Sequence, residues 1–469
     1  MKRVYAKLKR LIRRDTRDAS SPSSPSSSST KNRLKTARPP SPPAPAKQAD
    51  APLESLPPEV RHHLLASLDF QQCHSLVHAS PVYHQQFLSG RKLLLYPLLE
   101  NTLGGAALDA WAAFRAGSAR VSGRLTHGKA LGHLERYQER RSSDANFSIR
   151  QEDLTEDDLA FMTRFHCLIV APLVQRCAHR ALSNLAAEST AEHKDKEVPS
   201  TEQMNIEDLS QTELTRLQRS LYRFQLCCSL FGASRLTAPG VTGRNFEAEE
   251  ILVHFLGLFE PWEIEKIGCI YFFAKEKYEK IFRAIKWDVD PMNPKFEDER
   301  PPTPTGAFDF NNTWLCESLL EGTISRGLEL LNSVFDIDNH DQLVATMQEQ
   351  LTSPGGRDFL DDYGAWSDSA QSSRRRQHPS EGDAKTQRKD PMPFQGDNDS
   401  SPPIGWTTTW RETYSNLLGP SVPECFRRFG YVFWDVPRME STGARDVITK
   451  KCEAAWGDDY YDDPRDWLL

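Results

Sequence analysis

Features that would place this protein in a membrane or an export pathway are missing from its sequence. The 469 residues contain no run of about 18 apolar residues, the length that a membrane-spanning helix needs. Residues 1–14 have neither the apolar stretch nor the small-residue cleavage site of a secretory signal. The nine cysteines show no Cys-x-x-Cys spacing. The sequence therefore predicts reduced thiols, no transmembrane segment, and a location in the cytoplasm, the nucleus or both.

Strand signals and hydrophobic residues are scarce as well. Hydrophobic residues make up 38% of the chain, below the ~45–50% that is typical of folded domains. No Asn-Gly or Asp-Gly hairpin joins two alternating runs, and residues 430–434 (GYVFW) form the one short strand-like stretch. These absences predict a mainly α fold interrupted by polar stretches.

Two polar stretches account for the low hydrophobic content. Residues 1–52 contain the runs SSPSSPSSSSTK and ARPPSPPAPA. Residues 352–403 contain SDSAQSSRRRQHPSEGDAKTQRKD, which has no aromatic or branched aliphatic residue. Such segments cannot bury enough apolar area to offset the entropy that an ordered chain loses. We expect a disordered basic tail over 1–52 and a disordered linker over 352–403.

Charge is divided unevenly along the chain. Residues 1–50 hold thirteen Lys and Arg against three Asp and Glu, so they carry +10, and the net charge of -7 leaves -17 on the rest. An acidic body argues against nucleic-acid binding by the folded part, because phosphate binding needs clustered cations on the fold. Residues 1–14 have the pattern of a basic amphipathic helix, which suits an anionic lipid surface, an organelle or nuclear address, or a functionally silent tail.

The body over 96–351 has apolar residues at helical spacing. The clearest segment has Ser210 and Glu213 as a capping box and Gly232 as a stop. Its apolar residues step by three and four positions: Leu214, Leu217, Leu221, Phe224, Cys228 and Phe231. Further helices are expected at about 247–259, 262–287, 314–335 and 341–351. Residues 404–469 are rich in aromatic side chains, so we expect this last segment to pack back onto the helical body.

Residues 53–95 show the pattern of three short helices. The Leu56-Pro57 step opens the first helix, since its first turn tolerates proline and the helix dipole favours an acid at Glu59. The second helix ends near Pro81, and the third follows. Such a unit is smaller than the size that usually folds alone. Part of its apolar surface is therefore expected to rest on a partner or on the following domain.

This pattern resembles the F-box. That module begins with Leu-Pro-x-Glu-apolar, has two apolar positions near the end of its first helix, and has a leucine-rich second helix that closes at a serine with an aromatic residue soon after. The residues that match in order and spacing are Leu56, Pro57, Glu59, Val60, Leu64, Leu65, Leu68, Leu76, Ser80 and Tyr83. The sequence departs from the pattern early in the second helix, where Cys73 takes an apolar position among polar neighbours. The whole layout is also similar to that of fungal F-box-domain-containing proteins.

The resemblance implies a function without catalysis by this chain. The matching residues would bind a Skp-type adaptor protein of a cullin-type ubiquitin ligase, and the body would present an unknown protein substrate. No catalytic, cofactor-binding or metal-binding residues are implied. Two other interpretations stay open: a helical interaction or scaffold protein with no ubiquitin link, and an enzyme whose site is assembled from dispersed residues.

Two further motifs match poorly. Residues 123–130 (GRLTHGKA) have the glycine and lysine spacing of a phosphate-binding P-loop, but Ala130 replaces the hydroxyl that reaches magnesium and no buried strand precedes it. Two pairs of residues of zinc-binding type, about ten positions apart on an expected helix, lack standard ligand spacing: His166, Cys167, Cys177 and His179. Core and surface positions are favoured for these four residues.

Overall fold

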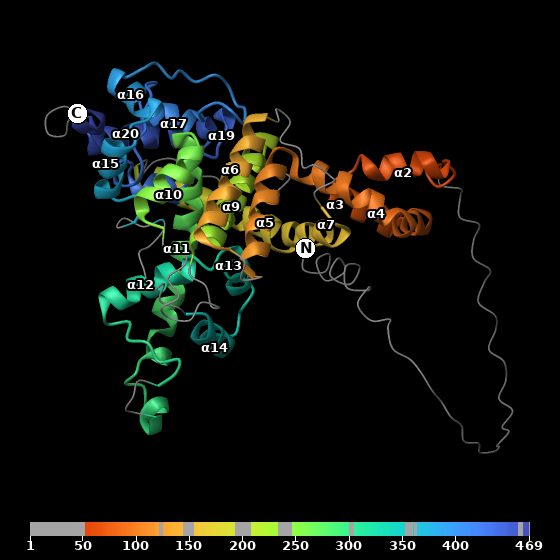
Figure 1. The fold of residues 1–469 in the computed structure, drawn as a ribbon, viewed down its shortest axis with the longest axis horizontal. Helices are drawn as coiled ribbons and strands as arrows, with labels where there is room; N and C mark the ends of the chain where they lie inside the picture. The colour runs from red at the N-terminus through yellow and green to blue at the C-terminus, as the bar shows by residue number, and fades with distance from the viewer. Residues whose placement is uncertain are drawn as a thin grey trace. The chain divides into compact units, whose positions relative to one another are not determined.

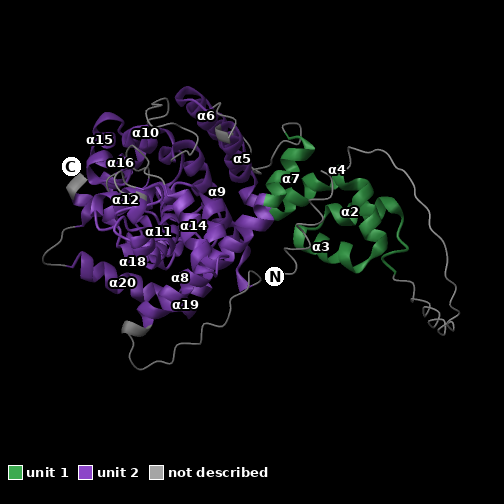
Figure 2. Cartoon of the chain, turned by 90° about the horizontal axis from the view of Figure 1, so that it is seen from below, with its two compact units in different colours: residues 1–102, 151–164 green, residues 103–150, 165–469 purple. Residues whose placement is uncertain are grey.

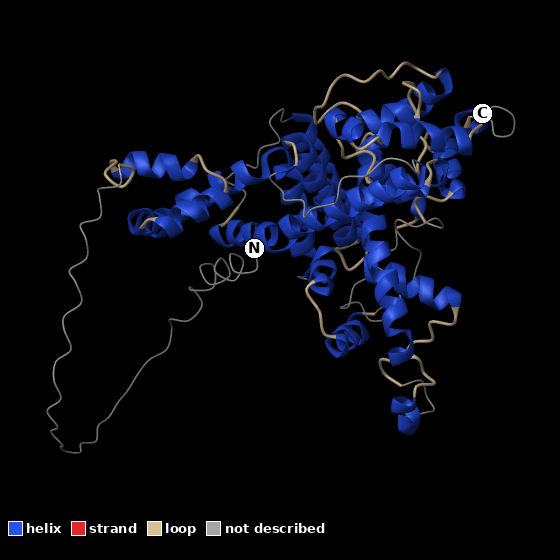
Figure 3. Ribbon diagram, turned by 180° about the vertical axis from the view of Figure 1, so that it is seen from behind, coloured by secondary structure: helices blue, strands red, loops and turns tan. Residues whose placement is uncertain are grey.

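The computed structural model describes residues 52–121, 125–143, 154–192, 208–232, 246–299, 304–351, 360, 364–457 and 463–468. Over these ranges the protein is mainly α-helical, as predicted, and its β structure is an isolated bridge between Pro391 and Thr413 (Figure 1; Figure 3). No helix within them is both long and apolar enough to cross a membrane. The expected basic tail lies outside the described residues except for Pro52.

The chain divides into two compact units (Figure 2). The first takes residues 1–102 and 151–164. Its helices are α2 (Pro58–Ala66), α3 (Phe70–Ala79), α4 (Pro81–Leu103) and α7 (Glu156–Phe165). The unit is larger than the expected 53–95 module, because α4 continues through Pro97 and α7 joins the three earlier helices. Pro97 has no amide hydrogen to donate to the carbonyl of Leu93, so α4 lacks one hydrogen bond of its helical ladder at this position.

The second unit takes residues 103–150 and 165–469. It begins with α5 (Ala107–Val121), α6 (His127–Ser143), the π-helical η3 (His166–Val170), α8 (Ala171–Glu192) and α9 (Gln211–Phe231). It continues with α10 (Ala248–His254), α11 (Pro261–Val289), α12 (Thr313–Ile324), α13 (Leu328–Phe335) and α14 (His340–Gln350). The later helices are α15 (Asp368–Gln377), α16 (Glu381–Arg388), α17 (Ile404–Thr409), α18 (Glu424–Arg428), α19 (Val436–Ser441) and α20 (Ala444–Ala455). Short 3₁₀ turns are η1 (Gly104–Ala106), η5 (Leu256–Leu258), η6 (Pro294–Glu299), η7 (Gly419–Ser421) and η8 (Pro464–Leu468).

Helices α9 and α11 form the centre of the second unit. α9 packs against α5, α8 and α11, and α11 also packs against α12, α14 and α18. In α11 every residue from Pro261 to Ala274 is buried, including its charged ones. Polar side chains of both helices therefore lie among other helices rather than in solvent.

The helices expected in the body are present with small shifts. α9 starts after Ser210, whose hydroxyl accepts a hydrogen bond from the amide of Glu213 at 3.1 Å in the expected capping box. α11 extends slightly beyond the expected 262–287 at both ends. The segment 314–335, for which helical structure is expected, forms the two helices α12 and α13. Gly327 lies between them with a φ of 85°, which ordinary residues rarely adopt and which separates the two helices.

Residues 364–403 are folded, so the expectation of a disordered linker over 352–403 is wrong for this part. The rest of that range, apart from one residue, lies outside the described chain. Trp366 is buried against α11, where a Cβ added to Gly268 would come within 2.5 Å of the indole ring. A glycine on α11 thus makes room for a tryptophan that anchors this segment.

Polar interactions fix the helices of the same segment. The side chain of Ser367 caps α15, and Ser380 forms a capping box at the start of α16. Arg374 of α15 donates two hydrogen bonds to Asp383 of α16, at 2.6 and 2.8 Å. This segment has no branched aliphatic residue, so helix caps and a bidentate ion pair stabilise it instead. The prediction of disorder considered only hydrophobic burial and therefore missed these polar interactions.

The expected strand-like stretch at 430–434 is a series of turns. Gly430 has a φ of 65°, and the chain turns before α19 instead of pairing with a neighbour. A Cβ on Gly405 of α17 would lie 2.0 Å from the carbonyl oxygen of Tyr431, so helices rather than strands enclose this stretch. The fully buried aromatic residues of the C-terminal segment include Trp406, Trp410, Phe426, Phe429, Tyr431, Phe433 and Trp434.

Candidate functional site

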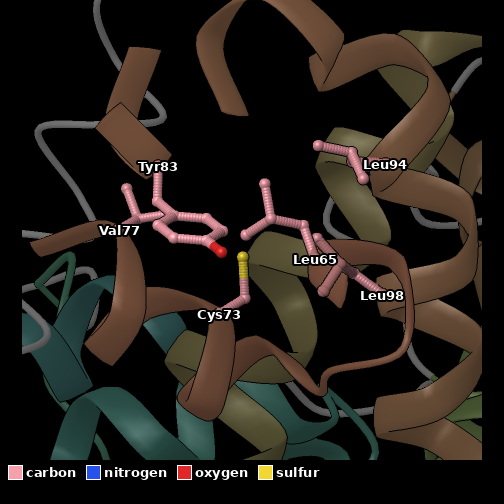
Figure 4. Packing of buried hydrophobic residues seen from close by; sticks show 6 residues of the cluster. All are labelled: Leu65, Cys73, Val77, Tyr83, Leu94 and Leu98. Atoms are coloured by element: carbon pink, nitrogen blue, oxygen red, sulfur yellow. The ribbon is translucent and has the colours of Figure 1, made fainter. Parts of the chain in front are cut away.

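The F-box-like module has a small core of its own. Its three helices contribute buried side chains that meet there: Leu65 from α2, Cys73 and Val77 from α3, and Tyr83, Leu94 and Leu98 from α4 (Figure 4). The side-chain amide of Asn101 in α4 donates hydrogen bonds of 2.8 and 3.0 Å to the carbonyls of Ala66 and Leu68. These bonds attach the end of α2 to α4 and complete a unit built by the three expected helices.

The segment before α2, residues 52–57, is anchored to the start of α4, and we call it the N-terminal strap. The hydroxyl of Ser80 donates to the carboxylate of Glu54 at 2.5 Å. The hydroxyl of Tyr83 donates to the carbonyl of Leu53 at 2.9 Å. Ser80 also accepts from the amide of Tyr83 at 3.3 Å, as a residue that caps the start of a helix does. Two residues that match the F-box pattern therefore hold the strap in place.

Replacing Tyr83 by phenylalanine is expected to loosen the strap while the core stays packed. The ring keeps its buried volume, but the carbonyl of Leu53 loses its donor, at a cost of about 1 kcal/mol. We expect faster amide hydrogen exchange in residues 53–56, measured by mass spectrometry, with a small change in thermal stability. Leu65→Ala is the contrasting variant, because it opens a core cavity and costs about 2–5 kcal/mol. Unchanged exchange in the strap of Tyr83→Phe would refute the positioning role of the hydroxyl.

The residues expected to bind an adaptor differ in exposure. Leu65, Ser80 and Tyr83 are buried, with 0%, 7% and 0% of their surface exposed. These three side chains hold the core and the strap, and the binding of an adaptor by the ten residues stays a prediction. Four are partly buried: Leu56, Leu64, Leu68 and Leu76. Three are exposed: Pro57, Glu59 and Val60.

Three of these ten residues, together with Leu53 of the strap, provide exposed or partly buried apolar side chains near the start of the module. We define the apolar edge as Leu53, Leu56, Val60 and Leu64, which follow one another at intervals of three and four residues. Leu53 is 50% exposed and Val60 is 45% exposed. Val60 and Leu64 are four positions apart on α2 and so share one side of that helix. Among the described residues, Leu53 and Val60 are exposed, and Leu56 and Leu64 are partly buried, with Leu64 also packed against the core.

The second unit contains a buried charge cluster that the sequence did not predict. Asp109 of α5 accepts hydrogen bonds from the Nε atoms of Arg219 and Arg223 on α9, at 3.1 and 2.9 Å. The hydroxyl of Tyr137 on α6 donates to the same carboxylate. Glu263 of α11 accepts from Nη1 of Arg223 at 2.7 Å. The cluster therefore connects four helices through charged hydrogen bonds.

Both carboxylates of this cluster stay ionised at neutral pH. Burial acts to raise the pKa of Asp109 and of Glu263, but nearby guanidinium groups outweigh burial and hold both pKa values below their usual range. Arg223 makes the largest of these contributions to each. The cluster is thus suited to joining helices, since its carboxyl groups exchange no protons near pH 7.

Ion pairs also attach the C-terminal segment to the two central helices. Arg427 of α18 donates to both carboxylate oxygens of Glu265 in α11, at 2.9 and 3.1 Å. Arg216 of α9 donates to Asp435 at 2.7 Å and to the carbonyl of Phe433 at 3.1 Å. The aromatic segment is therefore fixed by paired charges as well as by apolar packing.

The four residues of zinc-binding type do not form a site: His166 and Cys177 are buried, Cys167 is half-buried and His179 is exposed. His166 is buried, its Nδ1 lies 3.0 Å from the hydroxyl of Tyr222, and burial lowers its pKa to about 4. Burial raises the pKa of the Cys177 thiol to about 12. Across the described ranges, no three His, Cys, Asp or Glu side chains gather as a metal site. Residues 127–130 of the P-loop-like stretch form the first turn of α6.

Comparison with protein-family models, with curated proteins and with solved structures finds no match for this chain.

Proposed function

We propose that this protein is a non-catalytic recruiting subunit that attaches a partner protein to a cullin-type ubiquitin ligase, with the apolar edge docking on a Skp-type adaptor. The observation that supports the proposal is the division of the F-box-like residues. The buried residues Leu65, Ser80 and Tyr83 hold the core and the strap, whereas Leu56, Val60 and Leu64 contribute exposed or partly buried apolar side chains to the edge. A docking face needs this combination of reachable apolar groups and a rigid support.

The polar surroundings of the edge suit the same role. Pro57 and Glu59 are exposed beside Val60 in the first turn of α2. The helix dipole stabilises a carboxylate at this position. The same carboxylate can pair with a basic side chain at the margin of a partner's surface. The centre of the contact is apolar and its margin is charged, which is the usual anatomy of a protein interface.

The test is the affinity of the full chain for a purified Skp-type adaptor, measured by isothermal titration calorimetry. Val60→Glu places a charge in the centre of the edge, and we expect at least about a tenfold loss of affinity because an unpaired carboxylate is costly to bury. Leu88→Glu is the matched control, since Leu88 is 49% exposed and lies on α4 outside the edge. It should bind like the wild type.

Three outcomes would overturn the proposal. No binding by the wild type removes the ligase link and favours the helical interaction protein. Equal binding by the wild type and Val60→Glu places the contact elsewhere. Loss of binding in Leu88→Glu alone assigns the adaptor to another face of the module.

A further inference from the structure

A second surface of the first unit is built differently from the apolar edge. A cavity of about 80 Å³ opens among α3, α4 and α7, and neither the strap nor α2 lines it. Most of its lining is apolar: Phe70, Val77, Phe87, Leu88, Leu95 and Ala160. Polar or ionisable groups come from Cys73, His74, Arg91 and Thr163. The cavity reaches solvent beside Leu88, which is 49% exposed.

The size of the cavity selects the kind of group that enters it. Pockets for drug-sized ligands measure about 300–1,000 Å³, and an apolar cavity of about 150 Å³ holds benzene. A space of about 80 Å³ is too small for either. It fits one aliphatic side chain, as the anchor residue of an amphipathic helix does when the helix lies in a groove.

The charge of the residues around the cavity indicates which kind of partner segment would carry the bound side chain. Residues 70–99, which supply every lining residue from α3 and α4, contain no Asp or Glu, whereas Arg91 and Lys92 lie on α4. The acids of α7 are confined to its first turn, at Glu156, Asp157 and Asp158. The cavity is lined by later residues of α7, Ala160 and Thr163. Residues 51–469 carry a net charge of -17, so a stretch with only positive charges is unusual in this part of the chain. Its charge favours an acidic occupant.

We propose that the cavity is a docking site for an acidic amphipathic peptide segment of another protein, with one leucine-sized side chain in the cavity and carboxylates facing Arg91, which lines it, while the neighbouring Lys92 adds positive charge to the same stretch of α4. The chain's own residues 1–50 carry +10 and have the wrong sign for this site. The site is independent of the apolar edge, so a partner bound here and an adaptor bound at α2 need not compete.

A random peptide display library, selected against the full-length protein, tests this proposal. We expect enriched peptides to share a leucine, isoleucine or methionine flanked by Asp and Glu. Ala160→Leu adds three carbon atoms to the lining, which reduces the space in the cavity, and should weaken their binding at least about tenfold, whereas Ala160→Ser adds only one oxygen atom and should not. Changing the anchor of a selected peptide to alanine should have the same effect as filling the cavity.

Charge reversal provides a second readout that does not depend on cavity packing. The double variant Arg91→Glu with Lys92→Glu should select peptides rich in Lys and Arg instead. Thermal unfolding confirms that each variant is folded. No enrichment, enrichment of basic peptides by the wild type, or equal binding to Ala160→Leu overturns the inference. Val60→Glu should keep full peptide affinity while losing the adaptor, so failure here is distinct from failure of the ligase proposal.

Discussion

Replacing Asp109 by asparagine is expected to lower the free energy of unfolding by about 3–5 kcal/mol. The carboxylate is the shared partner of Arg219 and Arg223, whose side chains are 8% and 2% exposed. Asparagine keeps the side-chain volume but removes the negative charge. The positive charges of the two buried guanidinium groups are then less well neutralised, so their repulsion destabilises the folded state. Tyr137 also loses its charged acceptor. The measurement is urea denaturation followed by circular dichroism, with the wild type and the variant under the same conditions.

The control for this variant is Asp338→Asn. Asp338 is an exposed acid in the turn between α13 and α14, so its replacement should change stability by less than about 0.5 kcal/mol. A loss of less than about 1 kcal/mol for Asp109→Asn would contradict the account of the buried cluster. It would mean that solvent or rearranged side chains compensate the arginines.

Stability is expected to fall as the pH drops from 7 to 5, because two buried histidines stay neutral in the folded protein. Burial lowers the pKa of His133 and of His166 to about 4, whereas an unfolded histidine titrates near ~6.5. Between these values the unfolded chain binds protons that the folded chain does not bind, so acid favours unfolding. The expected loss is about 2 kcal/mol for each histidine over this pH range.

Single substitutions separate the two histidines. The Nε2 of His133 donates to the carbonyl of Ala112 at 3.1 Å, and the Nδ1 of His166 contacts the hydroxyl of Tyr222 at 3.0 Å. His133→Gln and His166→Gln each keep a polar side chain at the position but remove one imidazole that titrates. Each variant should show about half of the wild-type loss between pH 7 and 5. An unchanged pH slope in both variants would contradict the assignment.

The buried carboxylates add a separate loss at lower pH. The folded pKa values of Asp109 and Glu263 lie below the ordinary values of 3.8 and 4.5. Their contribution to stability is therefore complete above those ordinary values and disappears as the pH falls through the folded ones. The histidine and carboxylate phases thus occupy different pH ranges.

Local signals allowed much of the first unit to be predicted from the sequence. The Leu56-Pro57-Pro58 sequence marks the start of α2: Pro57 is the N-cap residue, and Pro58 occupies the first helical position, where proline is a short-range signal. Pro81 marks the change from α3 to α4, although it begins α4 rather than only ending α3. The sequence could not show that Ser80 and Tyr83 face inward, since their partners Glu54 and Leu53 lie about 30 residues away.

The buried charge cluster had no comparable local signal. Arg216, Arg219 and Arg223 follow one another at helical spacing on α9, which is also typical of a solvated helix face. Their acidic partners lie on α5, on α11 and after α18, between 40 and 219 positions away in the chain. Only the tertiary fold brings these charges together, so a pattern along one helix cannot distinguish the two cases.

Hydrogen exchange with mass spectrometry on the full chain, with and without a purified Skp-type adaptor, tests the proposed docking most directly. We expect added adaptor to slow exchange in residues 53–66, where the strap and α2 carry the apolar edge. The peptides around Ala160 on α7 should be unaffected. Protection confined to other segments, or none at adaptor concentrations that saturate a known F-box protein, would contradict the proposed docking.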